Sequence, residues 1–306
     1  MVAALKTYRE STVSNDLPRL IEAFKRAKEF NHPNVVRYLD YGVLEQSFEN
    51  LHFVVMELAP LDLEKYILNH SVVNSDSGNE RFRIGEVSQN KNREYSLSLK
   101  EVTLLFRDIL KGYDYLHQNK IIHRDLKPQN ILIYRVQGEI VPKISDHDEC
   151  KISELDLVRT TMIQGTREYA APELFEKHLS NNNLYETVDI YSLGCIYLFV
   201  LIKTCLEVDG KTFFDWMIVN QEEKVHNFIK ERIEMLYKNT NEKIRNCIIR
   251  LLYCTIKKSP LRIPLKDFYA VIKYILSLMN HSETADLYED VINDSLMEEI
   301  LKKNEK

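Results

Sequence analysis

The sequence predicts an α+β protein of two lobes, a small β-rich lobe followed by a larger, mainly helical one. Strand-like apolar runs cluster before residue 59, and helical periodicity dominates after residue 98. A chain of 306 residues that is 44% hydrophobic is long enough to bury both cores. The predicted units are a small lobe over 1–58, a large lobe over 59–279 and an acidic tail over 280–306.

The small lobe combines strands with one charged helix. A short apolar strand ends at Lys6, a helix covers 17–30, and strands follow at 35–39 and 52–58. The segment therefore looks like a small lobe that begins in its middle.

The large lobe is predicted to be helical after a polar insertion over 69–96, which is rich in Asn, Ser, Arg and Glu. Ser98 and Glu101 form a capping box, and apolar residues then recur at helical spacing up to Leu116. Further helices are predicted over 190–202, 224–238, 242–256 and 266–278, and the tail has the spacing of one more amphipathic helix.

Composition excludes several classes of function. The net charge is −5, from 41 basic and 46 acidic residues that are interspersed, so nucleic acid is not the expected partner. The apolar run 190–202 is too short to span a membrane. Spacing of the cysteines favours reduced core thiols over zinc ligands or disulfides, and hence a cytoplasmic protein; they are Cys150, Cys195, Cys205, Cys247 and Cys254.

The strongest motif is the segment 121–132, IIHRDLKPQNIL, which resembles the catalytic loop of the protein kinases. The resemblance implies a bilobal kinase-like fold that uses ATP and Mg²⁺. Asp125 would accept or orient the proton of a substrate hydroxyl, and Asn130 would hold Mg²⁺. Lys127 is typical of serine/threonine kinases and would neutralise the transferring phosphate.

A second segment, KISDHD over 143–148, stands where the family has Asp-Phe-Gly. Asp146 would therefore bind Mg²⁺. His147 replaces the usual Phe, and Asp148 replaces a Gly and adds a negative charge. Whether that charge assists metal binding or repels nucleotide stays open, and a transition-metal site at Asp-His-Asp is disfavoured because adjacent residues point to different faces.

Two further segments resemble structural parts of the family. GTREYAAPE over 165–173 is similar to the end of the activation loop, which places Thr166 against the catalytic residues and pairs Glu173 with Arg262. VDIYSLG over 188–194 is similar to the buried helix whose Asp anchors the catalytic loop. Asp189 alone would otherwise be an ordinary helix N-cap.

In the small lobe, VAALK over 2–6 resembles the strand whose Lys holds the α- and β-phosphates, here Lys6. Glu22 is the candidate partner of Lys6, although basic neighbours on its helix also offer ordinary solvated ion pairs. The segment 56–59, the hinge, would bind adenine through backbone groups of Glu57 and Ala59. Ala4 and Leu132 would cover the two faces of the base.

The glycine-rich loop that covers the phosphates in this family is not seen. Only five residues precede Lys6, and the first glycine is Gly42. The sequence is therefore expected to be either a truncated form or a protein that binds nucleotide weakly.

Within the kinases, the segment 31–38 and the spacing from Glu22 to Pro33 resemble the inositol-requiring sensor kinase/endoribonucleases of endoplasmic reticulum stress and ribonuclease L. That resemblance covers about residues 1–278 and implies a homodimer and the cytosolic face of the endoplasmic reticulum. Fewer than thirty residues follow the last predicted kinase helix, so no ribonuclease domain is expected.

Two functions follow from these residues. One is a serine/threonine kinase that acts on protein substrates, among them a second copy of itself in trans. The other is a pseudokinase that binds nucleotide and serves as a dimerising scaffold. Phosphorylation of Thr160 or Thr161, beside Arg159, would provide a charge for Arg124 and thereby regulate the enzyme.

Overall fold

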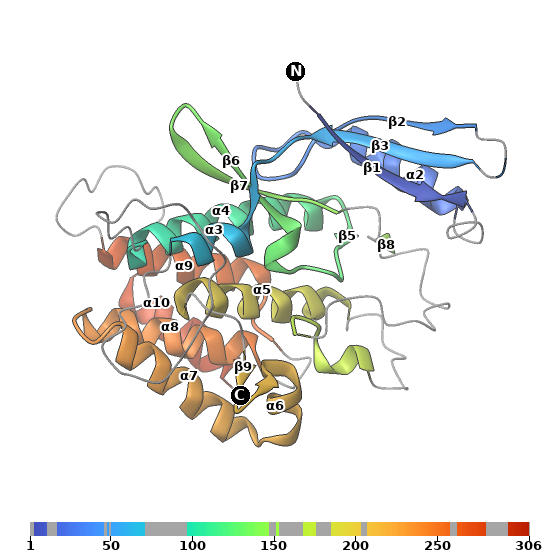
Figure 1. The fold of residues 1–306 in the computed structure, drawn as a ribbon. Coiled ribbons are helices and arrows are strands. Elements are labelled where there is room, and N and C mark those ends of the chain that lie inside the picture. The colour runs from blue at the N-terminus through green and yellow to red at the C-terminus, as the bar shows by residue number, and fades with distance from the viewer. Residues whose placement is uncertain are drawn as a thin grey trace, which may run out of the picture.

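The two-lobed α+β arrangement is confirmed in a computed structural model of the chain (Figure 1). A small antiparallel sheet with one helix stands above a larger body that is mostly helical. The structure describes residues 3–10, 17–45, 48, 50–70, 97–146, 151–152, 168–175, 185–202, 207–257, 262–279 and 293–305.

The small lobe is a three-stranded antiparallel sheet in the order β1-β3-β2. The strands are β1 (Ala3–Arg9), β2 (Tyr38–Leu44) and β3 (Leu51–Glu57), and α2 (Leu17–Lys28) packs on one face. Alternate residues of β3 are buried because only one face of the sheet is covered. Phe24 of α2 contacts the rings of three tyrosines from the sheet, and this aromatic cluster fixes the helix on it; they are Tyr8, Tyr38 and Tyr41.

One predicted strand of this lobe is displaced. The run 35–39 was expected to be a strand, but β2 begins at Tyr38, and Val35 forms only an isolated bridge to Ile144. The amide of Val36 donates to Ile144 O at 2.8 Å, and the amide of Ile144 donates to Asn34 O at 2.9 Å. The loop therefore pairs with a strand of the large lobe, which removes its first residues from the small sheet.

The junction between the lobes passes through the hinge into β4 (Leu61–Asp62) and α3 (Leu63–Asn69). Asp62 caps α3 by accepting from the amide of Lys65 at 2.8 Å. Because Asn69 still belongs to α3, the predicted insertion begins later than residue 69, and its residues 71–96 lie outside the described part of the chain.

The core of the large lobe is formed by α4 (Leu99–Gln118), α5 (Tyr185–Ile202), α8 (Glu242–Thr255) and α9 (Leu265–Met279). The predicted capping box at Ser98 is confirmed, since the Ser98 and Glu101 side chains each accept from the other residue's amide. Helix α5 is buried on all sides from Val188 to Leu201, as expected for a helix at the centre of a bundle.

The remaining helices surround this core. They are α6 (Phe213–Val219), α7 (Glu222–Leu236) and α10 (Asp294–Asn304). The predicted tail helix is confirmed as α10, which buries Met297 and Leu301 against the lobe. Helix α6 was not predicted, because seven residues are too few to show a helical period.

Short strands of the large lobe were also missed by the sequence analysis. A hairpin of β6 (Ile131–Val136) and β7 (Glu139–Ile144) follows the catalytic-loop segment directly. The others are two-residue strands: β5 (Ile121–Ile122) pairs with β8 (Lys151–Ile152), and β9 (Glu207–Val208) pairs with β10 (Lys211–Thr212). None of the helices in the described residues is long and apolar enough to cross a membrane.

Candidate active site

The catalytic-loop segment is anchored by Asp189, which lies inside α5 rather than at its N-cap. Its carboxylate accepts from the amide of His123 at 2.6 Å, from the amide of Arg124 at 2.8 Å and from the Tyr113 hydroxyl at 3.1 Å. Burial raises the pKa of Asp189, and the hydrogen bonds from these donors oppose that shift. The predicted anchoring role is confirmed, and the simpler N-cap interpretation is wrong because α5 begins four residues earlier, at Tyr185.

Asp125, Lys127 and Asn130 converge at the loop that Asp189 anchors. Lys127 Nζ lies 2.7 Å from Asp125 Oδ2. Asn130 Nδ2 donates to Asp125 O at 2.8 Å and to Asp125 Oδ2 at 3.0 Å. Since the nitrogen of the Asn130 amide faces Asp125, its oxygen is turned the other way and is available to a cation.

Asp146 is held beside Asn130 through its neighbour Ser145. The Ser145 amide and hydroxyl both donate to Asn130 O, at 2.9 and 3.0 Å, and the Ser145 carbonyl is bonded to His123 Nε2 at 2.8 Å. Asp146 has φ 68° and Arg124 has φ 67°, a left-handed conformation that costs a non-glycine residue roughly 1–3 kcal/mol. Such conformations cluster at functional sites, and here two of them flank the same group of side chains.

Lys6 connects this group to the small lobe through an ion pair with Asp146. The expected pair between Lys6 and Glu22 is not formed in this structure. Glu22 is exposed on α2 and has no ion pair with any described residue, because the Lys6 ammonium is directed at Asp146 instead. The structure thus connects Lys6 to Asp146 and, through the adjacent Ser145, to Asn130 and Asp125, whereas Glu22 lies apart from this group.

Ala4 and Leu132 lie on the two strands that border the hinge. Ala4 is paired with Met56 of β3, and Leu132 is paired with Asp62 of β4. Both side chains are half-buried against the core. They therefore stand on opposite lobes, as covering the two faces of a base requires.

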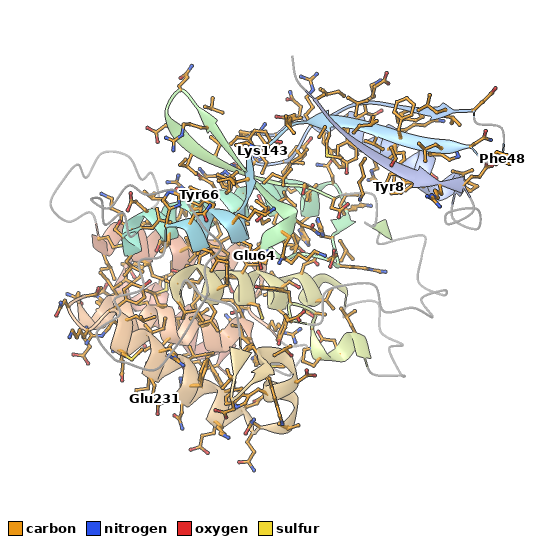
Figure 2. The ribbon with its side chains drawn as sticks, in the orientation of Figure 1. Tyr8, Phe48, Glu64, Tyr66, Lys143 and Glu231 are labelled. Carbon is orange, nitrogen blue, oxygen red and sulfur yellow. The ribbon has the colours of Figure 1, made fainter. Side chains whose placement is uncertain are left out.

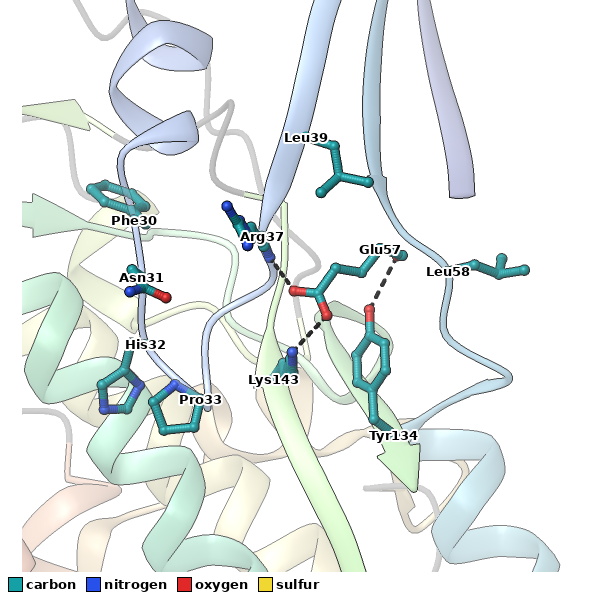
Figure 3. Close-up of a pocket in the computed structure, with 10 residues that line it drawn as sticks. All are labelled: Phe30, Asn31, His32, Pro33, Arg37, Leu39, Glu57, Leu58, Tyr134 and Lys143. Carbon is teal, nitrogen blue, oxygen red and sulfur yellow. Dashed lines mark hydrogen bonds and ion pairs between the residues drawn. The ribbon is translucent and has the colours of Figure 1, made fainter. Parts of the chain in front are cut away.

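Glu57, at the start of the hinge, is fixed at both ends by residues that the sequence analysis missed (Figure 3). Its carboxylate accepts from the Arg37 amide at 2.7 Å and from Lys143 Nζ at 2.6 Å, and its backbone carbonyl accepts from the Tyr134 hydroxyl at 3.1 Å. The available signal was the period of β6, since Tyr134 is two residues after Leu132 and shares its face of the strand.

A cavity of about 640 Å³ lies next to these contacts. Its lining comes from the loop 30–33, the start of β2, the hinge and the hairpin β6–β7, and Figure 2 shows Lys143 at this junction of the lobes. Of the residues predicted to contact nucleotide, only Glu57 lines it. The cavity therefore shares Glu57 with the proposed nucleotide contacts, while Ala4, Leu132 and Asp146 do not line it.

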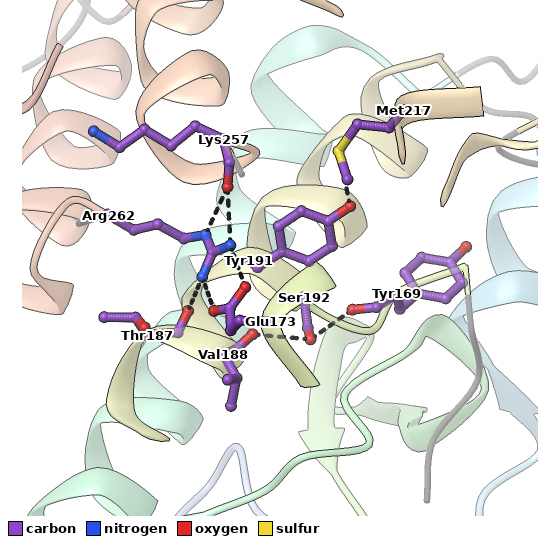
Figure 4. Close-up of polar contacts among 9 residues, drawn as sticks. All are labelled: Tyr169, Glu173, Thr187, Val188, Tyr191, Ser192, Met217, Lys257 and Arg262. Carbon is purple, nitrogen blue, oxygen red and sulfur yellow. Dashed lines mark hydrogen bonds and ion pairs between the residues drawn. The ribbon is translucent and has the colours of Figure 1, made fainter. Parts of the chain in front are cut away.

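The expected pair of Glu173 and Arg262 is confirmed and is buried (Figure 4). Both guanidinium Nη atoms reach the carboxylate, with Nη2 at 2.9 Å from Oε2, and the guanidinium also donates to Lys257 O at 2.9 and 3.1 Å and to Thr187 O at 3.2 Å. Its Cζ atom lies over the Tyr191 ring, 5.0 Å from the ring centroid. This network fixes residues 172–175 to the start of α5.

Several predicted residues lie outside the described part of the chain. They are His147, Asp148, Arg159, Thr160, Thr161, Thr166, Cys150 and Cys205. The other three cysteines are buried and unbridged, as predicted. No cluster of three or more His, Cys, Asp or Glu side chains with metal-binding geometry occurs in the described residues.

Comparison with known proteins gives the family. The protein kinase domain model matches residues 1–285. Inhibitor of nuclear factor kappa-B kinase subunit alpha is 32% identical over 191 residues in Gallus gallus and 33% over 194 in Xenopus laevis, matches that cover 62% of this chain and 22% of each relative. Cyclin-dependent kinase 4 of Xenopus laevis is 30% identical over 199 residues, which is 63% of this chain and 53% of that protein. With a family model that matches most of its length, and with the contacts described above, this chain belongs to the protein kinase domain family.

Proposed function

We propose that this domain is a Mg-ATP-dependent protein serine/threonine kinase that transfers the γ-phosphate of ATP to a protein hydroxyl. The observation that supports it most is that Asp125, Asn130 and Asp146 lie together, with Ser145 joining Asp146 to Asn130, and that Lys6 of the small lobe is directed at Asp146. Only a few charged groups on two lobes are needed for phosphoryl transfer, provided that they are positioned around the nucleotide.

The donor set fits Mg²⁺. Asn130 offers an amide oxygen and Asp146 a carboxylate, which are hard oxygen ligands, and Mg²⁺ at such sites takes its other ligands from phosphates and water. ATP would supply the transferable phosphoryl group, and Mg²⁺ would balance its charge.

The roles of the other residues follow from their positions. Asp125 would accept or orient the proton of the attacking hydroxyl, with Lys127 at 2.7 Å from it to balance the transferring phosphate. Lys6 would exchange Asp146 for the α- and β-phosphates, with Glu22 as its partner after a movement of α2. Backbone groups of Glu57 and Ala59 would bind the adenine edge.

Substrate class and setting are also part of the proposal. Lys127, two residues after Asp125, and the two kinases matched above favour serine and threonine as acceptors. We include protein substrates, a second copy of the chain acting in trans, a homodimer and a cytoplasmic location. The narrower resemblance to the endoplasmic reticulum stress kinases, and with it the cytosolic face of that membrane, rests on residues 31–38 and the spacing from Glu22 to Pro33.

Phosphate incorporation tests the proposal directly. Purified protein with Mg²⁺ and γ-labelled ATP should label itself or generic basic and acidic protein substrates, and Asp125→Asn should reduce the label at least 100-fold. Asp114→Asn, an exposed change on α4, should leave it unaltered. Wild-type protein that incorporates no more label than Asp125→Asn would refute kinase activity.

A pseudokinase is the second candidate, and the Lys6–Asp146 ion pair favours it. That pair neutralises the two groups proposed for phosphate and metal, while Glu22 is exposed. A pseudokinase should bind nucleotide in calorimetry, show no incorporation, and change its dimerisation with nucleotide in analytical ultracentrifugation. Labelling that Asp125→Asn abolishes would exclude it.

A further inference from the structure

Glu57 is held at its backbone and at its side chain by two neighbouring strands of the large lobe. The Tyr134 hydroxyl of β6 donates to Glu57 O at 3.1 Å, and Lys143 of β7 bonds to the Glu57 carboxylate at 2.6 Å (Figure 3). Without such contacts, the backbone of the segment between the lobes would be free to rotate its peptide groups. Here the first peptide of the hinge is oriented by the hairpin β6–β7.

Tyr134 is well placed to act as a permanent donor. The Lys143 ammonium lies over its ring, 4.7 Å from the centroid, and pairs with Glu57, so the three side chains restrain one another. Burial is the main cause that raises the pKa of Tyr134, and the negative charge of Glu57 raises it further. The hydroxyl therefore keeps its proton at neutral pH. The hydrogen bond to the Glu57 carbonyl is thus present throughout the physiological range.

Backbone groups of Glu57 are proposed above to bind the adenine edge, and of these the carbonyl is the one that can accept from the adenine amino group. A carbonyl oxygen has two lone pairs, and Tyr134 uses one, which leaves the other to a ligand. Leu132, proposed to cover the base, is on the same face of β6 as Tyr134. One strand would therefore set both the surface under the base and the direction of the acceptor at its edge.

We propose that Tyr134 is a positioning residue for base recognition, and that its hydroxyl directs the Glu57 carbonyl toward a purine 6-amino group. This inference rests on the proposed nucleotide site. It makes the selectivity for adenine depend on a tyrosine that does not itself contact the base. Lys143 supports the same arrangement by holding the Glu57 carboxylate.

Calorimetry with two nucleotides tests this role. ATP carries the 6-amino group, and purine riboside triphosphate lacks it but is otherwise the same. With Mg²⁺ present, Tyr134→Phe should weaken the binding of ATP by about three- to ten-fold, the range that corresponds to the loss of one neutral hydrogen bond. The affinity for purine riboside triphosphate should change less than two-fold.

Two further variants separate positioning from general damage. Tyr237→Phe removes a bond of the same kind, from a hydroxyl to the Leu201 carbonyl at 2.7 Å in the large lobe, and should alter neither affinity. Lys143→Met leaves the Tyr134 hydroxyl in place but removes one of the two contacts of the Glu57 carboxylate, and should reduce the preference for ATP in the same direction.

The outcomes also separate this inference from the proposed function. Wild-type protein that binds neither nucleotide refutes the nucleotide site and the inference with it. If the wild-type protein binds ATP but Tyr134→Phe weakens the binding of both nucleotides equally, or strengthens the binding of ATP, the positioning role alone is refuted.

Discussion

Asp189 is the residue on which the geometry of the catalytic-loop segment depends. It is fully buried and accepts from two backbone amides and one hydroxyl. Asp189→Asn would turn an N–H group toward these donors, so we expect the free energy of unfolding to fall by about 2–4 kcal/mol. Urea denaturation followed by circular dichroism measures this change.

Glu231→Gln is the matched control for Asp189→Asn. Glu231 is exposed on α7, far from the site (Figure 2), and its replacement should change stability by less than about 0.5 kcal/mol. If Asp189→Asn were as stable as this control, the anchoring role of Asp189 would have to be abandoned.

The buried thiols give a pH dependence at the same scale. Burial raises the pKa of Cys195 and Cys254 to about 12 and that of Cys247 to about 11. Unfolded thiols ionise near pH 8.5, so the unfolded chain loses protons first as the pH rises, and the stability falls through the window from about 8.5 to 11–12. We expect a loss of about 2 kcal/mol per thiol by pH 10.

Denaturation at pH 8 and pH 10 tests this effect of the thiols. Cys195→Ala should show a smaller loss between the two values than the wild type, whatever its stability at pH 8. Iodoacetamide at pH 8 should leave the three thiols unmodified in the folded protein, as read by peptide mass spectrometry. Rapid alkylation of Cys195 before unfolding would contradict the burial that underlies the shift.

At the scale of elements, the Glu173–Arg262 pair connects residues 172–175 to α5 and to the segment before α9. The exposed fractions of the two side chains are 5% and 0%. Arg262→Met would leave the Glu173 carboxylate buried without its partner and should cost about 3–5 kcal/mol. Adding Glu173→Leu should restore part of that loss, because a buried ion pair often contributes little more than apolar side chains of similar size.

A double-mutant cycle measures the coupling between these two positions. Arg262→Lys is the informative control, since an ammonium cannot form the two parallel hydrogen bonds of the guanidinium and should recover only a fraction of the stability. Additive effects of Arg262→Met and Glu173→Leu would show that the pair is not a coupled unit.

At the scale of the molecule, the fold could be predicted from long apolar segments and from the order of the motifs. Contacts between distant segments could not be predicted from the sequence. Helices α4, α8 and α9 were found because their apolar spacing repeats over several turns, and α5 was found because its apolar run is continuous. The strand expected at 35–39 was displaced because Asn34 and Val36 pair with Ile144, more than a hundred residues away.

The same limit applies to the candidate site. Asp125, Asn130 and Asp189 are recognisable because short motifs fix their spacing. The choice of Asp146 over Glu22 as the partner of Lys6, and the bond from Tyr134 to Glu57, depend on how the two lobes meet. From charge alone, the carboxylates of Glu22 and Asp146 could each pair with Lys6.

Contact between the lobes passes through Gly112 of α4, against which the backbone of Asn34 packs directly. A Cβ at position 112 would overlap Asn34 O, and Asn34 also donates to Pro142 O at 2.9 Å. Gly112→Ala gains up to about 1 kcal/mol of helix propensity, but the neighbour is backbone and cannot rotate away. We therefore expect a net loss of about 1–3 kcal/mol.

The loss of stability in Gly112→Ala should be larger in the small lobe, because displacement of the loop at Asn34 also displaces β2 and its partner β3. Hydrogen exchange read by mass spectrometry should rise in peptides covering 38–57 and remain unchanged in those covering α8 and α9. Asp114→Ala, exposed and half a turn further along α4, should alter neither region. A contact that stabilises only the junction of the lobes confines the change to the small lobe. Uniform loss of protection in both lobes would therefore show that the packing of Asn34 against Gly112 stabilises the whole domain.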